Sequence, residues 1–208
     1  TVDKFAFPDD TRSTLATGLS SARRSLAGAA NSGTAAYFAG GNTGSAVATV
    51  DKFAFSDDSR TTLGTGLSSA RRNLAGAANS GTAAYFAGGT PPTVATVDKF
   101  AFADDGRTTL GTGLSSSRSD LAGAANSGTA AYFAGGYAAS QVATVDKFAF
   151  SDDGRTTLGT GLSVGTFALA GAANSGTAAY FAGGYVLGTG AIATVDKFAF
   201  SDDSRTTL

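Results

Sequence analysis

Hydrophobic and polar residues alternate over short stretches along the whole chain. In Thr49–Phe55, for example, an aspartate and two phenylalanines share one face, while a valine, a lysine and an alanine share the other. This period of two residues predicts β-strands. Helical spacing of apolar residues is absent from the sequence, and its many glycines and β-branched residues also disfavour helices. We therefore predict an all-β protein.

Four short strands are predicted in each unit of this pattern. Asn73–Asn79 and Thr82–Gly89 flank Ser80-Gly81, a dipeptide typical of a tight hairpin turn. A strand such as Thr49–Phe55 follows, and an Asp-Asp turn leads it into a strand such as Arg60–Leu63. An aspartate side chain in such a turn is expected to cap its own backbone.

The pattern repeats along the chain. The motif Val-Asp-Lys-Phe-Ala-Phe begins at Val2, Val50, Val97, Val145 and Val195, so the starts are 48, 47, 48 and 50 residues apart. Four antiparallel strands at this period are typical of β-propeller blades. A solenoid is the main alternative, although its repeats are usually shorter or helical.

The unit resembles a kelch repeat. The kelch pattern has a double glycine, an aromatic residue near it, a further aromatic in the following strand, and an arginine before the next blade. Gly88-Gly89, Tyr85, Phe100 and Arg118 match these features. The usual tryptophan of the fourth strand is replaced by an arginine, and Thr166 stands where Arg71 occurs in the second unit. The resemblance therefore implies a degenerate kelch-like β-propeller, similar to repeats in phage tail or virion appendage proteins.

The kelch strand order predicts a single repeat array over residues 1–208, with four complete blades and an N-terminal half blade. The half blade is residues 1–15, and the blades are about 23–63, 71–110, 118–158 and 166–208. Both ends carry the same outer half of a blade, so they cannot complete each other. We expect ring closure to need further blades of the same polypeptide or another subunit.

Composition excludes several functions. The formal net charge of −1 favours neither nucleic acid nor a membrane surface as a partner. Cysteine, histidine and methionine are absent, and every acidic residue is aspartate. Thiolate zinc sites and cysteine nucleophiles are thereby excluded, and so are the Cys, Tyr and His copper ligands of kelch-type oxidases. We expect no cofactor.

Aspartate pairs recur in the outer hairpin of every unit. A catalytic pair is normally unique in a chain, so we interpret these pairs as turn residues, with a weak calcium site or catalysis as the alternatives. The arginine two residues after each pair is expected to pair with it locally. Arg23, Arg71 and Arg118 enter the innermost strand, where they either pack or face a central channel and bind an anion or glycan.

The connectors after each double glycine are the one region where the units differ. They occupy equivalent places, so we expect them on one face, where repeat proteins often bind partners. Neutral variation of loops is the alternative. The candidate partner-binding residues are Asn42, Thr43, Pro91, Pro92, Tyr137, Tyr185, Val186 and Leu187.

These features predict a non-enzymatic structural or interaction propeller that binds a protein or a glycan. We expect an extracellular or virion-associated location. The alternatives are a segment of a larger glycan-active enzyme and an intracellular kelch-type adaptor.

Overall fold

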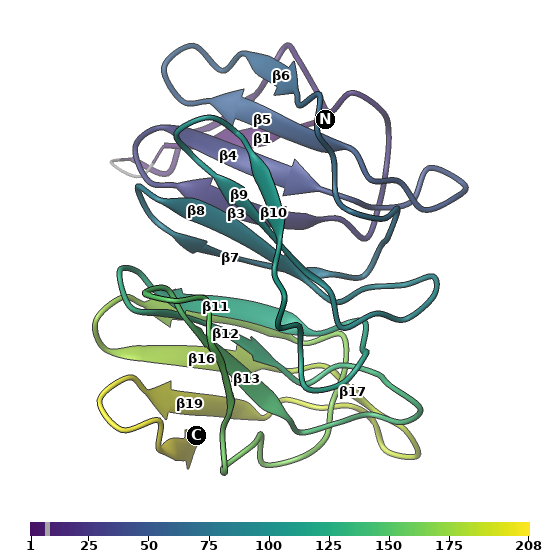
Figure 1. The fold of residues 1–208 in the computed structure, drawn as a ribbon, viewed down its shortest axis with the longest axis vertical. Coiled ribbons are helices and arrows are strands. Elements are labelled where there is room, and N and C mark those ends of the chain that lie inside the picture. Colours follow the sequence, from purple (N-terminus) through teal and green to yellow (C-terminus); the bar gives the residue numbers. More distant parts are fainter. Residues whose placement is uncertain (7–8) are drawn as a thin grey trace.

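The computed structural model describes residues 1–6 and 9–208. All regular structure in this part of the chain is β, and helices are absent from it. Four four-stranded antiparallel sheets follow one another in chain order, and a two-stranded sheet precedes them (Figure 1). The predicted all-β repeat structure is confirmed at this level. The described sheets do not close into a ring, so the propeller remains a prediction.

The strand order is the same in each four-stranded sheet, with each strand paired to the next strand of that sheet along the chain. The two-stranded sheet is β1 (Asp3–Phe5) and β2 (Arg12–Thr14). The first sheet is β3 (Ala27–Asn31), β4 (Ala35–Ala39), β5 (Val50–Ala54) and β6 (Arg60–Thr62). The second is β7 (Ala75–Asn79), β8 (Ala83–Ala87), β9 (Val97–Ala101) and β10 (Arg107–Thr109). The third is β11 (Ala122–Asn126), β12 (Ala130–Ala134), β13 (Val145–Ala149) and β14 (Arg155–Thr157). The fourth is β15 (Ala170–Asn174), β16 (Ala178–Ala182), β19 (Val195–Ala199) and β20 (Arg205–Thr207). A small hairpin, β17 (Tyr185–Val186) and β18 (Gly190–Ala191), interrupts the fourth sheet.

The outer hairpins turn at the aspartate pairs, as predicted. In the first sheet, Asp57 Oδ1 accepts a hydrogen bond of 3.0 Å from the backbone N–H of Ser59. Asp58, the second of the pair, has a φ of 56°. Aspartate is one of the few residues other than glycine that adopts this left-handed conformation readily. The pair therefore builds the turn.

The innermost strands of successive sheets lie very close together. An added Cβ at Gly76 in β7 would stand 2.2 Å from the carbonyl oxygen of Gly28 in β3, and one at Gly123 in β11 would stand 2.3 Å from that of Gly76. Only glycine fits at such a backbone approach. This contact explains why the innermost strands consist of small residues.

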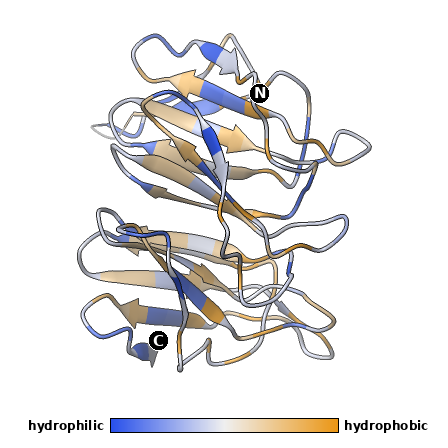
Figure 2. Ribbon diagram, viewed as in Figure 1, coloured by the Kyte–Doolittle hydropathy of each residue, from blue (hydrophilic) through white to orange (hydrophobic). Residues whose placement is uncertain are grey.

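Aromatic rings fill the space between sheets. Phe86, Phe100, Phe133 and Phe148 are fully buried. Phe86 and Phe100 meet edge to face, with ring centroids 5.9 Å apart, a favourable geometry for aromatic pairs. Hydrophobic residues dominate strands such as β4, whereas hydrophilic residues mark short outer strands such as β6 (Figure 2).

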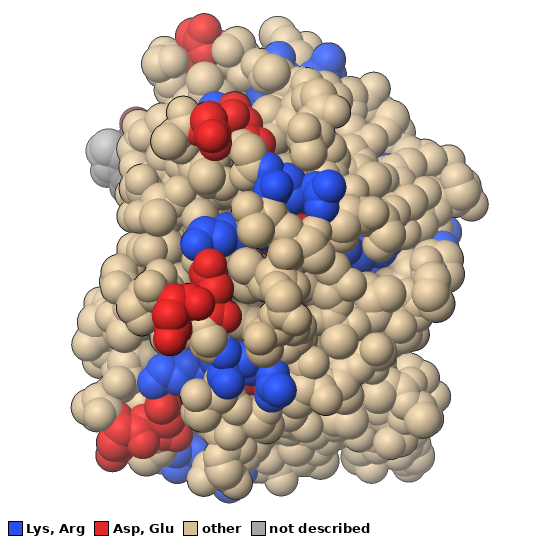
Figure 3. All heavy atoms as spheres, in the orientation of Figure 1, with Lys and Arg blue, Asp and Glu red and all other residues tan. Residues whose placement is uncertain are grey.

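In addition to this packing, a polar contact joins each four-stranded sheet to the next, and we call it the Tyr–Lys–Asp cluster. Tyr85 Oη in the second sheet donates a hydrogen bond of 2.7 Å to Asp153 in the third, and Lys99 Nζ lies 2.8 Å from the same carboxylate. Lys99 also lies over the Tyr85 ring, 5.4 Å from its centroid. Burial, the hydrogen bond to Asp153 and the charge of Asp153 all raise the pKa of Tyr85. Equivalent clusters are Tyr37, Lys52 and Asp105, and Tyr132, Lys147 and Asp203. Acidic and basic side chains accordingly alternate along one side of the molecule (Figure 3).

The sequence left open whether the arginines before the innermost strands pack or face a central channel, and the structure shows that they pack. The Arg71 side chain is buried and forms an ion pair of 2.9 Å with Asp98 on β9 of its own sheet. Arg23 and Arg118 pair in the same way with Asp51 and Asp146. Packing, the first of the two alternatives, is therefore confirmed for these three arginines, and the alternative of a channel-facing anion site is wrong. The expected pairing of the outer-strand arginines with the adjacent Asp pairs is also wrong, since Arg107 and Arg155 lie nearest Asp98 and Asp146.

Candidate binding face

The four variable connectors occupy equivalent positions, and together they form what we call the loop face. The first residue of each connector forms an antiparallel bridge with the residue three positions before the start of the innermost strand of the same sheet. These bridges are Arg24 with Asn42, Arg72 with Thr90, Ser119 with Tyr137, and Phe167 with Tyr185. The fourth connector is the β17–β18 hairpin, which lies beside the other connectors at the right of Figure 1.

Three aromatic rings gather on the loop face, on the third and fourth sheets. The rings of Tyr137 and Phe167 have centroids 5.6 Å apart, and those of Phe167 and Tyr185 are also 5.6 Å apart. Tyr185 is 44% exposed, and Leu187 beside it is 49% exposed. The chain thus keeps a partly exposed aromatic cluster and an apolar side chain at one place on its surface.

The other predicted loop residues divide between exposed and buried positions. Thr43, Pro91 and Pro92 are exposed. Asn42 is buried, and its Oδ1 accepts a hydrogen bond of 2.8 Å from the N–H of Gly44, so it shapes its loop. Val186 is buried as well, although Tyr185 in the same strand is exposed, so Val186 offers no exposed contact on the loop face.

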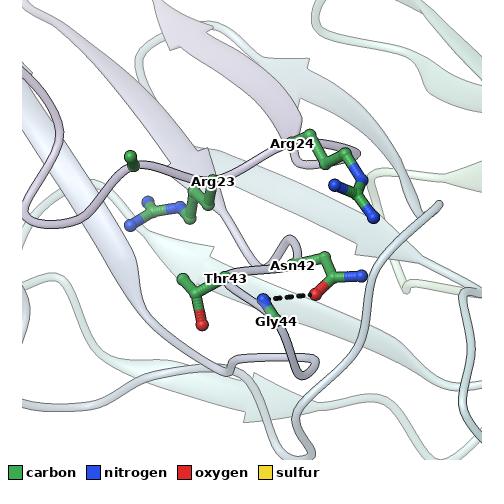
Figure 4. A pocket seen from close by; sticks show the side chains of 6 residues that line it. Arg23, Arg24, Asn42, Thr43 and Gly44 are labelled. Atoms are coloured by element: carbon green, nitrogen blue, oxygen red, sulfur yellow. Dashed lines mark hydrogen bonds between the residues drawn. The ribbon is translucent and has the colours of Figure 1, made fainter.

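A shallow hollow of ≈ 390 Å³ lies on the loop face of the first sheet. It is lined by Ala22, Arg23, Arg24, Asn42, Thr43 and Gly44. Figure 4 shows Asn42 and Thr43 across this hollow from the two arginines. Its lining is polar and basic, in contrast to the aromatic cluster on the third and fourth sheets.

Arg24 and Arg72 differ from the arginines immediately before them. Arg23 and Arg71 form buried ion pairs, whereas Arg24 and Arg72 form no ion pair with another described residue. Both residues take part in the bridges that anchor the connectors. The loop face therefore carries two cations on the first two sheets and three aromatic rings on the last two.

Sequence reasoning missed one member of this face. Phe167 stands at the position that holds Arg24, Arg72 and Ser119 in the other units, and this variation was the signal that could have identified it. The connectors alone drew attention because they vary in length. The bridge between the two segments brings Phe167 between Tyr137 and Tyr185.

The Asp pairs lie away from the loop face, in the outer hairpins. Their first member caps the turn, and the second member in the last three sheets accepts the Tyr and Lys donors of the preceding sheet. Among residues 1–6 and 9–208, no three Asp side chains gather as a metal site would require. Within the same residues, no helix is long and apolar enough to cross a membrane.

No family model matches the chain, and no significant match was found among curated proteins.

Proposed function

We propose that the chain is a non-enzymatic interaction module, a kelch-like β-propeller array that binds a protein or a glycan on its loop face. Its setting in this proposal is an extracellular or virion-associated assembly. The sheets act as a rigid support, and the connectors supply the contacts. The repeated four-stranded sheets and the common placement of the connectors support this proposal.

The cluster of Tyr137, Phe167 and Tyr185 carries the proposal. Aromatic rings that remain partly exposed offer a large apolar face together with polar tips, and such residues are enriched where proteins bind partners. Sugar rings and apolar protein side chains both stack on faces of this kind. The exposed Leu187 extends the apolar surface beside Tyr185.

The two unpaired arginines add a second type of contact. An arginine offers a planar set of donors that suits carboxylates, sulfates and peptide carbonyls. Arg24 is exposed and Arg72 is half-buried, and they lie on adjacent sheets. A ligand that spans the face would therefore combine polar or anionic groups at one end with an apolar or ring-shaped group at the other.

The test is binding of the intact chain to a glycan array and to a panel of candidate protein partners. We expect Tyr137→Ala and Tyr185→Ala each to weaken binding by about tenfold or more, the effect typical of a central aromatic contact. Tyr180→Ala is the control, because it removes a tyrosine from β16, outside the loop face. Binding that survives replacement of all four connectors would overturn the proposal.

A further inference from the structure

A groove of ≈ 320 Å³ lies between the two-stranded sheet β1–β2 and the first four-stranded sheet. Its lining is mostly apolar and includes Phe5, Leu15, Phe38, Phe53 and Phe55, with Asp58 at its margin. Phe5 is 60% exposed and Phe55 is 43% exposed. These are among the most exposed large hydrophobic side chains of the described chain, and they face one groove.

The equivalent place is filled at each of the other three junctions between sheets. Tyr37 of the first sheet packs against Phe102 of the second, with centroids 5.1 Å apart, and donates to Asp105. Tyr85 and Tyr132 make the same contacts with the next sheets. In the repeat, Phe55 and Asp58 correspond to Phe102 and Asp105. Among the described residues, however, Asp58 accepts a hydrogen bond only from Lys4 Nζ, at 2.8 Å, and none from a tyrosine. The groove is thus the place that an inner hairpin, such as β7–β8 with its tyrosine, occupies at the other junctions.

The edge of β1 is also open. The corresponding strands β5, β9, β13 and β19 are hydrogen-bonded on both sides, whereas β1 pairs only with β2 within the described chain. An unpaired strand edge is a ready template for another strand. Asp3 on β1 corresponds to Asp98 on β9, which receives Ser68 and Arg71 from the segment before an inner hairpin. The Asp3 side chain is instead 39% exposed and binds only Thr14 and Arg12.

We propose that this groove binds an inner hairpin of the repeat type, including the segment that precedes it, by adding a strand to the free edge of β1. The register at the other junctions places the tyrosine of the incoming hairpin opposite Lys4, with its hydroxyl on Asp58, and the preceding arginine and serine on Asp3. This proposal does not rest on the loop face.

The occupant is a hairpin whose second strand is itself unpaired. A second folded copy of this chain offers none, because β4, β8, β12 and β16 already pair with β5, β9, β13 and β19. The source is therefore a further repeat, on this or another polypeptide. Strand addition of this kind draws affinity from main-chain hydrogen bonds and specificity from side-chain pockets.

The experiment adds a synthetic peptide with the sequence of residues 67–89 to the intact chain. We expect saturable one-to-one binding by calorimetry and slower amide exchange at Asp3 and Phe5, whose N–H groups face the free edge of β1. A Tyr85→Phe peptide is expected to bind about tenfold more weakly, since a hydrogen bond to a charged group is lost. Asp58→Ala in the chain, which removes the acceptor, should remove that difference between the two peptides.

A second pair of variants tests the Asp3 contact. An Arg71→Thr peptide copies the change that occurs naturally at Thr166 and should bind more weakly than the parent peptide. Asp3→Ala in the chain, which removes the acceptor, should abolish this difference while it leaves the Tyr85→Phe effect intact. Both aspartates are partly exposed, so circular dichroism is expected to show folded variants.

Three results would overturn the proposal. The first is an absence of binding at millimolar peptide, and the second is equal binding of a scrambled peptide. The third is protection confined to β15, which would place the peptide on the open side of the fourth sheet instead of in the groove.

Discussion

At the scale of single residues, the main feature is a buried carboxylate in each four-stranded sheet. Asp98 accepts hydrogen bonds from the N–H and Oγ of Ser68 and from Thr109, and it pairs with Arg71. Burying a charge is costly unless it is paired and hydrogen-bonded, and here both conditions are met. This network ties the segment entering the sheet to its third and fourth strands.

The fourth sheet provides a natural comparison. Asp196 keeps the bonds from Ser163 and Thr207, but Thr166 replaces the buried arginine, and the nearest cation is Arg205 Nε at 3.8 Å. We predict that Asp98→Asn lowers the free energy of unfolding by about 3–5 kcal/mol, because it leaves Arg71 buried without a counter-charge. Asp196→Asn leaves no such buried cation and should cost about 1 kcal/mol. Denaturant titration followed by circular dichroism measures both, and equal losses would contradict the role of Arg71.

The buried ion pair of Asp98 and Arg71 should also make the stability of the fold depend on pH. Burial alone would raise the pKa of Asp98, but hydrogen bonds from Thr109 and Ser68 and the charge of Arg71 hold it below its ordinary value. A carboxyl whose pKa is lower in the folded state stabilises the fold above its unfolded pKa of about 4 and loses this contribution as the pH falls. The stability difference between the parent chain and Asp98→Asn should therefore shrink below about pH 4.

At the scale of elements, the closest contact is between the inner strands. Gly76 lies against the backbone of β3, whereas an added Cβ at Gly28 would meet only the Phe38 ring, at 3.6 Å. The two glycines stand at the same position of identical Ala-Gly-Ala-Ala-Asn strands. They differ only in whether another sheet lies on that side.

We predict that Gly76→Ala lowers the free energy of unfolding by about 1–3 kcal/mol or more, since the backbone of β3 must move to admit the methyl group. Gly28→Ala is the matched control and should be close to neutral, because its methyl group makes an ordinary contact and alanine restricts the unfolded chain. The denaturant concentration at the unfolding midpoint, measured for both variants and for the parent chain, tests this difference. A similar loss in both would mean that the inner strands do not pack as closely as described.

Strands and turns could be predicted from the sequence, whereas several contacts could not. Alternation and the Ser-Gly and Asp-Asp turns are local signals, so β6, β7 and β8 lie within the predicted ranges. The partners Arg71 and Asp98 are far apart in sequence and meet only through the packing of the sheet. Likewise, Phe167 joins the loop face through a bridge between two segments, and Val186 is buried by a hairpin that the connector sequence did not reveal.

At the scale of the whole molecule, the sheets form a row in which each contacts its immediate neighbours. β7 contacts β3 and β11, and β11 contacts β7 and β15. In such arrays stability is close to a sum of the stabilities of the units and of the interfaces between neighbours. A sheet with one neighbour should therefore open more readily than a sheet with two.

The inner strands allow this difference to be measured without a mutation. β7, β11 and β15 share the sequence Ala-Gly-Ala-Ala-Asn after a leucine, so the intrinsic exchange rates of their amides match. All five residues of β15 are exposed, whereas every residue of β7 and β11 is buried or half-buried. We predict slower hydrogen exchange in β7 and β11 than in β15. Mass spectrometry can measure the exchange of each strand separately, on fragments that begin at Asn73, Asp120 and Ala168, because the first residues give the fragments different masses. Equal protection of the three strands would mean that the sheets open as one cooperative unit and that the missing neighbour costs the fourth sheet nothing.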